Sequence, residues 1–120
     1  MEPRFVNGRR VTDKDTMEIE EMVLAKVNKE LVTLVESLGV QAVGVSGKDG
    51  GLLQCKKKLS KGEDLGYVGE VTKVNPKILQ DLLERDFLPI VFPIGFDENF
   101  DSYNINADDA ACAISEAVNA

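Results

Sequence analysis

One short segment, Tyr103 to Asp108 (YNINAD), has polar residues of the types and spacing that a ligand-binding site needs. Side chains alternate along an extended backbone, so we expect Asn104 and Asn106 on the same side of a short strand. Asn amides can hydrogen-bond an amide or a carboxylate of a ligand. Asp108 begins a predicted helix, where it could cap the helix or hold ammonium groups in place. Such a group between a buried strand and a helix is typical of sites at strand ends in α/β proteins.

Arg10 is a candidate ligand for a carboxylate. It lies in the segment Asn7 to Asp13 (NGRRVTD), where Asn-Gly between two short extended runs predicts a tight hairpin. An Arg on a small hairpin can close over a carboxylate and bind it through two parallel N–H bonds. The alternative, which the residues alone favour, is a surface Arg paired with Asp13 or Asp15.

Two further segments could contact phosphate, although an ordinary structural interpretation is favoured for both. Ser46 to Gly51 (SGKDGG) follows a predicted strand, and clustered glycines can cradle phosphate with backbone amides. The segment matches neither the P-loop nor the dinucleotide-binding pattern, so a tight turn is the favoured interpretation. Lys56 to Lys58 is the only basic run, and a solvated strand edge is favoured there.

The composition excludes several kinds of chemistry. The chain has 120 residues, which suit a single domain, and a formal charge of −7, which disfavours nucleic acid as a partner. It contains no histidine, so histidine triads and histidine metal sites are excluded, and we predict no metal site. Its two cysteines are not closely spaced, which fits a reduced, cytoplasmic protein. No apolar run is long enough to cross a membrane.

A long helix is predicted between the hairpin and the first buried strand. Apolar residues recur with helical spacing from Ile19 to Leu38, and Gly39 is placed to end the helix. A helix over 16–38 would be about 34 Å long. We expect one end to pack on a sheet and an exposed portion to be available to a partner subunit.

The remaining elements alternate between helix and strand. Strands are predicted at 41–46 and 87–94, the second irregular or at an edge because of Pro89 and Pro93. Between them, 52–58 and 66–74 are expected to pair as a hairpin. Asn75-Pro76 should start a helix, with Asn75 as its N-cap. The segment 107–118 should form an Ala-rich helix. This order predicts an α/β fold without internal repeats.

Several of these segments, in the same order, resemble acetylglutamate kinases. The resemblance covers essentially the whole chain and rests on NGRRVTD, MEIEEMVL, KVNKEL, AVGVSGKDGGL, LGYVGEV, VNPKIL and YNINADDAA. It implies an amino-acid-kinase α/β/α sandwich, of which residues 1–120 would be one partial domain, the acyl-amino-acid-binding part. That part would comprise the lid hairpin, the long helix, sheet strands and a β-hairpin.

The resemblance also implies a reaction. Such a kinase phosphorylates the side-chain carboxylate of N-acetyl-L-glutamate with ATP and Mg²⁺, a step of arginine biosynthesis. By the same resemblance, Arg10 binds a substrate carboxylate, Asn104 contacts the acetylated amino acid, and Asp108 orients the lysines that neutralise the transferring phosphoryl group. A homo-oligomer in the cytoplasm is expected.

Some features depart from the family pattern. The family's Lys-Gly-Gly loop, second glycine-rich loop and nucleotide-binding half have no counterpart in these 120 residues. We therefore expect no residues that hold ATP and no kinase activity in the isolated chain. A Gly that is usual between Ala25 and Lys26 is missing, which would rotate one side of a regular helix by about 100°. Arg9 and Glu20 stand where apolar residues are usual, and Phe100 replaces a common turn Gly.

Two alternatives remain beside the kinase segment. The chain could be a non-catalytic module derived from an acetylglutamate kinase, which binds an acidic metabolite or pairs with another chain through its long helix. It could also serve a kinase for a related acid such as aspartate or carbamate, an interpretation that the motifs support less well.

Overall fold

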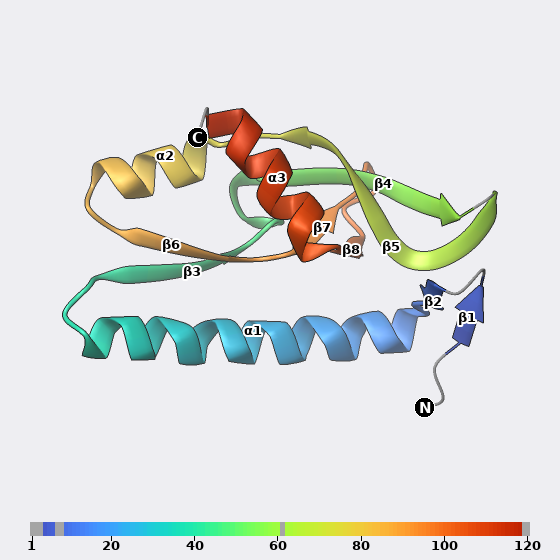
Figure 1. Ribbon diagram of the computed structural model, residues 1–120, viewed down its shortest axis with the longest axis horizontal. Coiled ribbons are helices and arrows are strands. Elements are labelled where there is room, and N and C mark those ends of the chain that lie inside the picture. Colours follow the sequence, from blue (N-terminus) through green and yellow to red (C-terminus); the bar gives the residue numbers. More distant parts are fainter. Residues whose placement is uncertain (1–3, 7–8, 61, 119–120) are drawn as a thin grey trace.

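The elements form three layers in a computed structural model, which describes residues 4–6, 9–60 and 62–118, with side chains from residue 12 onward. The helix α1 (Lys14–Ser37) lies along one face of the strands β3 (Ala42–Ser46) and β6 (Leu88–Phe92), whereas α2 (Lys77–Glu84) and α3 (Ala107–Val118) lie beyond the other (Figure 1). This arrangement confirms the predicted α/β class.

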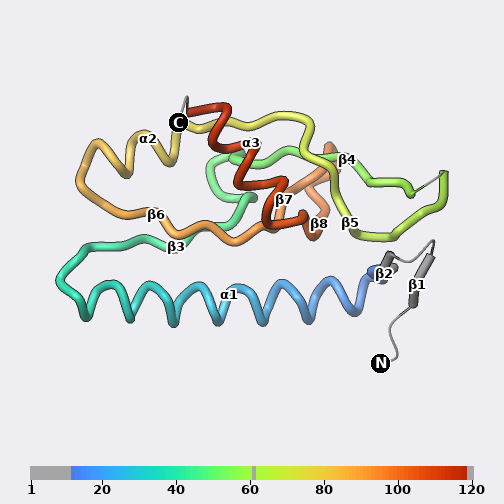
Figure 2. Tube along the Cα trace, viewed as in Figure 1, coloured from blue at the N-terminus to red at the C-terminus, as the bar shows by residue number. Residues whose placement is uncertain are grey.

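The long helix is uninterrupted along its length (Figure 2). It begins two residues earlier than predicted because Asp13 is its N-cap and accepts a hydrogen bond from the Thr16 backbone N–H at 2.7 Å. Gly39 follows its end with φ +91°, a conformation that glycine adopts without steric cost. The sequence therefore predicted both ends of α1 to within two residues.

Polar residues dock α1 on the sheet. Asn28 is 2% exposed, and its Nδ2 donates to the Ile90 backbone oxygen at 2.9 Å. Lys29 Nζ donates to the Gly44 backbone oxygen at 2.8 Å. The regularly spaced apolar residues of the helix lie elsewhere on its surface and are 44–56% exposed, namely Ile19, Val23, Val27, Leu31 and Leu34. The exposed apolar portion that the sequence predicted is therefore present.

The prediction of one strand over 87–94 is wrong, because the strand is interrupted at Pro93. The chain instead forms β6, which pairs in parallel with β3, and then β7 (Ile94–Phe96), which belongs to a different sheet. Proline lacks the N–H that would continue the ladder, and the chain changes sheets at this position. The residues of β6 from Pro89 onward are half-buried rather than fully buried.

The second sheet closes into a small barrel. The predicted hairpin is confirmed, with longer strands, as β4 (Leu53–Ser60) and β5 (Glu63–Val74), and β8 (Ser102–Ile105) and β7 complete the ring. Its interior joins the main hydrophobic core, whose buried members are Val45, Leu52, Leu53, Cys55, Leu79, Tyr103, Ile105 and Ala110.

The shorter elements follow the prediction closely. The strands β1 (Arg4–Val6) and β2 (Arg9–Val11) pair antiparallel, while the predicted Asn7-Gly8 turn lies outside the described residues. A 3-10 turn, η1, spans Asp49–Gly51. The assigned N-cap of α2 is Pro76, one residue after the predicted Asn75, and Asn75 Oδ1 still accepts a hydrogen bond from the Lys77 backbone N–H at 3.2 Å. The helix α3 has the predicted bounds.

Candidate functional site

A pocket of about 440 Å³ lies between α1 and the end of β8. Its walls are mostly apolar, formed by Ile19, Val23, Leu24, Pro93, Ile105 and Ala107. Three polar residues, Glu20, Asn104 and Asn106, also line it. A concave, largely apolar site with a few convergent polar groups is typical of small-molecule binding.

Asn104 is held in the middle of the barrel sheet. Its strand β8 runs parallel to β5, where Asn104 pairs with Val68, and antiparallel to β7, where it pairs with Ile94. The flanking Tyr103 and Ile105 are buried on the opposite side of the strand, at 6% and 2% exposure. The sheet therefore fixes the backbone of Asn104, and its side-chain amide donates to Glu20 Oε2 at 2.9 Å.

Asn106, and not Asp108, caps the helix that follows. Asn106 Oδ1 accepts hydrogen bonds from the backbone N–H groups of Asp108, at 2.9 Å, and Asp109, at 3.1 Å. Both Asn106 and Asn104 line the pocket, as their spacing predicted, although Asn106 lies just beyond the strand. The sequence left open whether Asp108 caps α3, and this geometry assigns the cap to Asn106.

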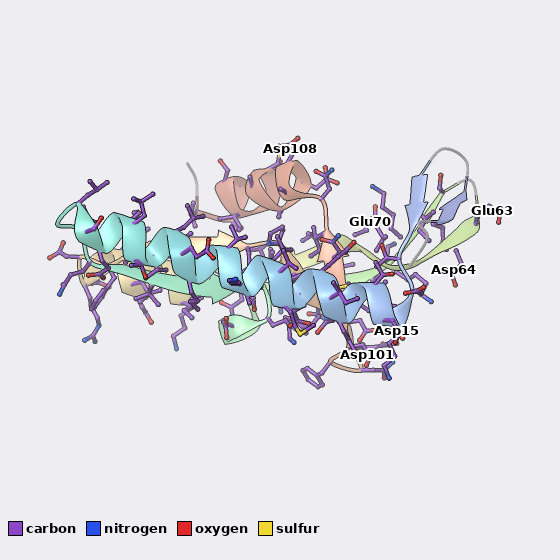
Figure 3. All side chains as sticks on the ribbon, turned by 90° about the horizontal axis from the view of Figure 1, so that it is seen from below. Asp15, Glu63, Asp64, Glu70, Asp101 and Asp108 are labelled. Carbon is purple, nitrogen blue, oxygen red and sulfur yellow. The ribbon has the colours of Figure 1, made fainter. Side chains whose placement is uncertain are left out.

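Asp108 is exposed in the first turn of α3 and does not line the pocket. Figure 3 shows it on α3, apart from Asp15 at the start of α1 and Asp101 in the loop before β8. The part of the chain that the structure describes gives Asp108 no ion pair with a lysine. Its carboxylate is therefore accessible to cationic groups from outside these residues.

Arg10 lies in the middle of β2, opposite Phe5. Its side chain is outside the described residues, so its predicted contact with a carboxylate stays a prediction. The end of the hairpin is tied to the barrel at Thr12, whose N–H donates to the Leu65 oxygen at 2.9 Å and whose oxygen accepts from the Tyr67 N–H at 2.7 Å. The anchor places the hairpin beside β5, at the start of α1 (Figure 1).

The SGKDGG segment is a self-contained turn. Asp49 Oδ2 accepts from the Ser46 backbone N–H at 2.7 Å, and Ser46 Oγ accepts from the Lys48 N–H at 3.1 Å. Lys48 Nζ pairs with Glu21 at 2.9 Å. The turn uses these amides itself, which confirms the favoured interpretation over a phosphate cradle.

The basic run is neutralised locally. Lys56 pairs with Glu70 at 3.8 Å, Lys57 with Asp64 at 3.2 Å, and Lys58 with Asp109 at 3.9 Å. Hydrogen bonds from the Gly66 N–H and from Lys57 lower the pKa of Asp64. These pairs fit the favoured interpretation of an ordinary strand edge.

The described residues carry few other chemical groups. None of their His, Cys, Asp and Glu side chains gather in a group of three or more that could hold a metal ion. Burial raises the pKa of Cys55 to about 12, with a further contribution from the negative charge of Asp97, so this thiol stays protonated at neutral pH. Among the described helices, none combines the length and hydrophobicity that a membrane crossing requires.

Sequence reasoning missed Glu20 as a pocket residue. Its partner Asn104 is 84 positions away, and no periodicity connects the two. The only signal was that Glu20 stands where the resemblance places an apolar residue.

Comparisons with known proteins agree with this geometry. The sequence model described as amino acid kinase family matches residues 1–120. An acetylglutamate kinase of Campylobacter jejuni is 60% identical over 116 residues, which cover 97% of this chain and 40% of the relative. An acetylglutamate kinase of Desulforamulus reducens is 50% identical over 121 positions, covering 100% of this chain and 42% of the relative. The chain thus spans about two fifths of the length of these curated relatives.

Solved structures show the same fold. The crystal structure of smu.665 from Streptococcus mutans UA159 superposes with a TM-score of 0.86 at 30% identity, covering 100% of this chain and 49% of that one. The structure of an N-acetylglutamate synthase from Neisseria gonorrhoeae, complexed with coenzyme A and N-acetyl-glutamate, superposes with a TM-score of 0.81 at 20% identity. The match covers 99% of this chain and 27% of that one, and it shows a likeness of fold alone. Since the family model matches from the first residue to the last, the chain belongs to the amino acid kinase family.

Proposed function

We propose that residues 1–120 form the acyl-amino-acid-binding part of a kinase that phosphorylates the side-chain carboxylate of N-acetyl-L-glutamate with ATP, a step of arginine biosynthesis. The observation that carries this proposal is the 60% identity to an acetylglutamate kinase over 116 residues. Phosphoryl transfer depends mainly on positioning and charge neutralisation, so a site without a nucleophilic side chain is sufficient.

The pocket between α1 and β8 supports a role in holding the acyl amino acid. Its apolar walls suit the acetyl group and the methylene chain, and Asn104 supplies a polar contact. Arg10 on the hairpin would bind a carboxylate of the ligand through two parallel hydrogen bonds. Asp108, exposed at the start of α3, would orient lysines that neutralise the transferring phosphoryl group.

The co-substrate belongs to the same proposal. ATP would enter with Mg²⁺ and be held by parts of the kinase that have no counterpart in these residues. The exposed apolar residues of α1 support assembly into a homo-oligomer. A cytoplasmic location, and the absence of nucleic-acid and membrane partners, are expectations of the same proposal.

A second candidate is a non-catalytic interaction module, which the exposed apolar face of α1 also favours. The face extends over the helix from Ile19 at 46% exposure to Leu34 at 56%. Such a face could bind another chain without any kinase chemistry. The two candidates differ in whether these residues support turnover in the context of a complete kinase.

The proposal is tested by a chimera. Residues 1–120 would replace the matching segment of the Campylobacter jejuni acetylglutamate kinase, and ADP release would be measured with N-acetyl-L-glutamate, aspartate or carbamate and MgATP. We expect turnover with N-acetyl-L-glutamate alone, and none from the isolated 120 residues. A folded chimera without activity would favour the interaction module, and preference for another acid would contradict the proposed substrate.

A further inference from the structure

Glu20 is the only acidic side chain that lines the pocket between α1 and β8, among the residues the structure describes. It is half-buried, and its Oε2 atom lies 2.9 Å from Asn104 Nδ2. Placing a carboxylate in a mostly apolar wall costs desolvation free energy, which the hydrogen bond to Asn104 partly offsets. The contact therefore affects the orientation of the Asn104 side-chain amide.

The Glu20 carboxylate determines whether the nitrogen or the oxygen of the Asn104 amide faces α1. A carboxylate only accepts hydrogen bonds, so the amide must present its nitrogen to Glu20. The amide is planar, and its oxygen is directed away from the nitrogen that Glu20 holds. Because the two neighbouring strands fix the backbone of Asn104, the side chain has little freedom to adjust in another way.

The same contact determines which group of a ligand can pair with the Asn104 oxygen. This oxygen accepts hydrogen bonds and does not donate them, so an N–H of a ligand can pair with it. A ligand carboxylate, which also only accepts, cannot.

We propose that Glu20 is a positioning and specificity residue of this pocket. It holds the Asn104 amide with its oxygen free, so that a ligand meets Asn104 through an N–H donor and places its carboxylates elsewhere. The inference rests on the proposed function, in which the ligand is an acylated amino acid with one amide N–H and two carboxylates.

A pair of ligands tests this specificity in the full chain. N-acetyl-L-glutamate carries the N–H, whereas (S)-2-acetoxyglutarate has the same shape with an ester oxygen in its place. By titration calorimetry we expect the wild-type chain to bind the ester roughly tenfold more weakly, the effect of losing one hydrogen bond. Equal affinity of the wild-type chain for both ligands would overturn the proposal.

Variants at the same position separate orientation from charge. Glu20→Gln keeps an oxygen that can accept from Asn104, so it should retain the discrimination between amide and ester. Glu20→Val frees the Asn104 amide to turn, so it should bind both ligands within roughly threefold of each other. Glu30→Val removes a charge from an exposed position of the same helix and should behave as the wild type. Retained discrimination in Glu20→Val would contradict the proposal.

The hydrogen bond between Glu20 and the Asn104 side chain can be measured without any ligand. In ¹⁵N NMR spectra, the side-chain NH₂ pair of Asn104 should be similarly shifted and protected from exchange in the wild type, Glu20→Gln and Glu30→Val, and should lose both properties in Glu20→Val. An unchanged pair in Glu20→Val would overturn the positioning role. If no variant bound either ligand while the pair responded as expected, the proposed ligand would be wrong but the contact real.

Discussion

Gly66 packs directly against the backbone oxygen of Thr12, where β5 receives the end of the β1–β2 hairpin. Thr12 is 2% exposed and exchanges backbone hydrogen bonds with Leu65 and Tyr67, on either side of Gly66. Gly66 also has φ +76°, which side-chain-bearing residues rarely adopt. The hairpin that carries Arg10 is thus anchored at a position that admits only glycine.

We predict that Gly66→Ala destabilises this anchor. A methyl group there would collide with the Thr12 carbonyl and also add backbone strain, for a loss of about 2–4 kcal/mol in the free energy of unfolding. Gly62→Ala is the matched control, because Gly62 has φ +80° but open space around it and should cost only about 1–2 kcal/mol. Urea denaturation of both variants measures the difference, and equal losses would contradict the close contact.

Asn106→Ala should weaken the start of α3. The substitution removes the oxygen that accepts from the Asp108 and Asp109 backbone N–H groups, at a cost of about 1 kcal/mol. Asn106→Asp retains a capping oxygen and should be nearly neutral. Hydrogen exchange of these two amides, compared between the variants, reports the cap directly, and unchanged protection in Asn106→Ala would show that the cap does not act as described.

Stability should fall at alkaline pH because of Cys55. Burial raises its pKa from 9.0 to about 12, so the folded chain holds this proton where the unfolded chain releases it. The contribution is complete below about pH 9 and is lost as the pH rises toward 12. Cys55→Ala should give a shallower decline in denaturation experiments over this range, whereas substitution of the exposed Cys112 by Ala should not. Identical slopes for all three proteins would contradict the burial of this thiol.

Arg10→Ala should weaken the binding of N-acetyl-L-glutamate. Loss of two charge-assisted hydrogen bonds to a carboxylate predicts a decrease in affinity of roughly 10–100-fold. Arg9→Ala removes the same charge from the neighbouring position of β2 and should change affinity by less than roughly threefold. Calorimetric titration distinguishes the two, and equal losses would indicate a general charge effect and not a specific Arg10 contact.

Much of the fold could be predicted because local signals were strong. The apolar spacing of α1, its Gly39 stop and the paired strands β4 and β5 each rest on neighbouring residues. Pro93 predicts an irregular strand, but the change of sheets at this residue depends on strand partners far along the chain. The apolar spacing of α1 located the helix without identifying its docked face, because Asn28 and Lys29 make that contact through polar groups.

The site was predictable only in part. Asn104 and Asn106 were found through their spacing, and the structure brings both to one pocket. The assignment of the cap to Asn106 required hydrogen-bond geometry, since Asp108 has an equally suitable side chain. The Glu20 contact could not be predicted, because it joins a helix and a strand that only the folded chain brings together.

The central claim is that the pocket between α1 and β8 holds the acyl amino acid, and a ¹H–¹⁵N NMR titration of the chain with N-acetyl-L-glutamate tests it most directly. We predict saturable shifts of Glu20, Asn104 and Ile105, which line the pocket, and none at Ile78 or Leu82 on α2. Shifts confined to α2, or no saturable shift at any residue of the pocket, would contradict the account.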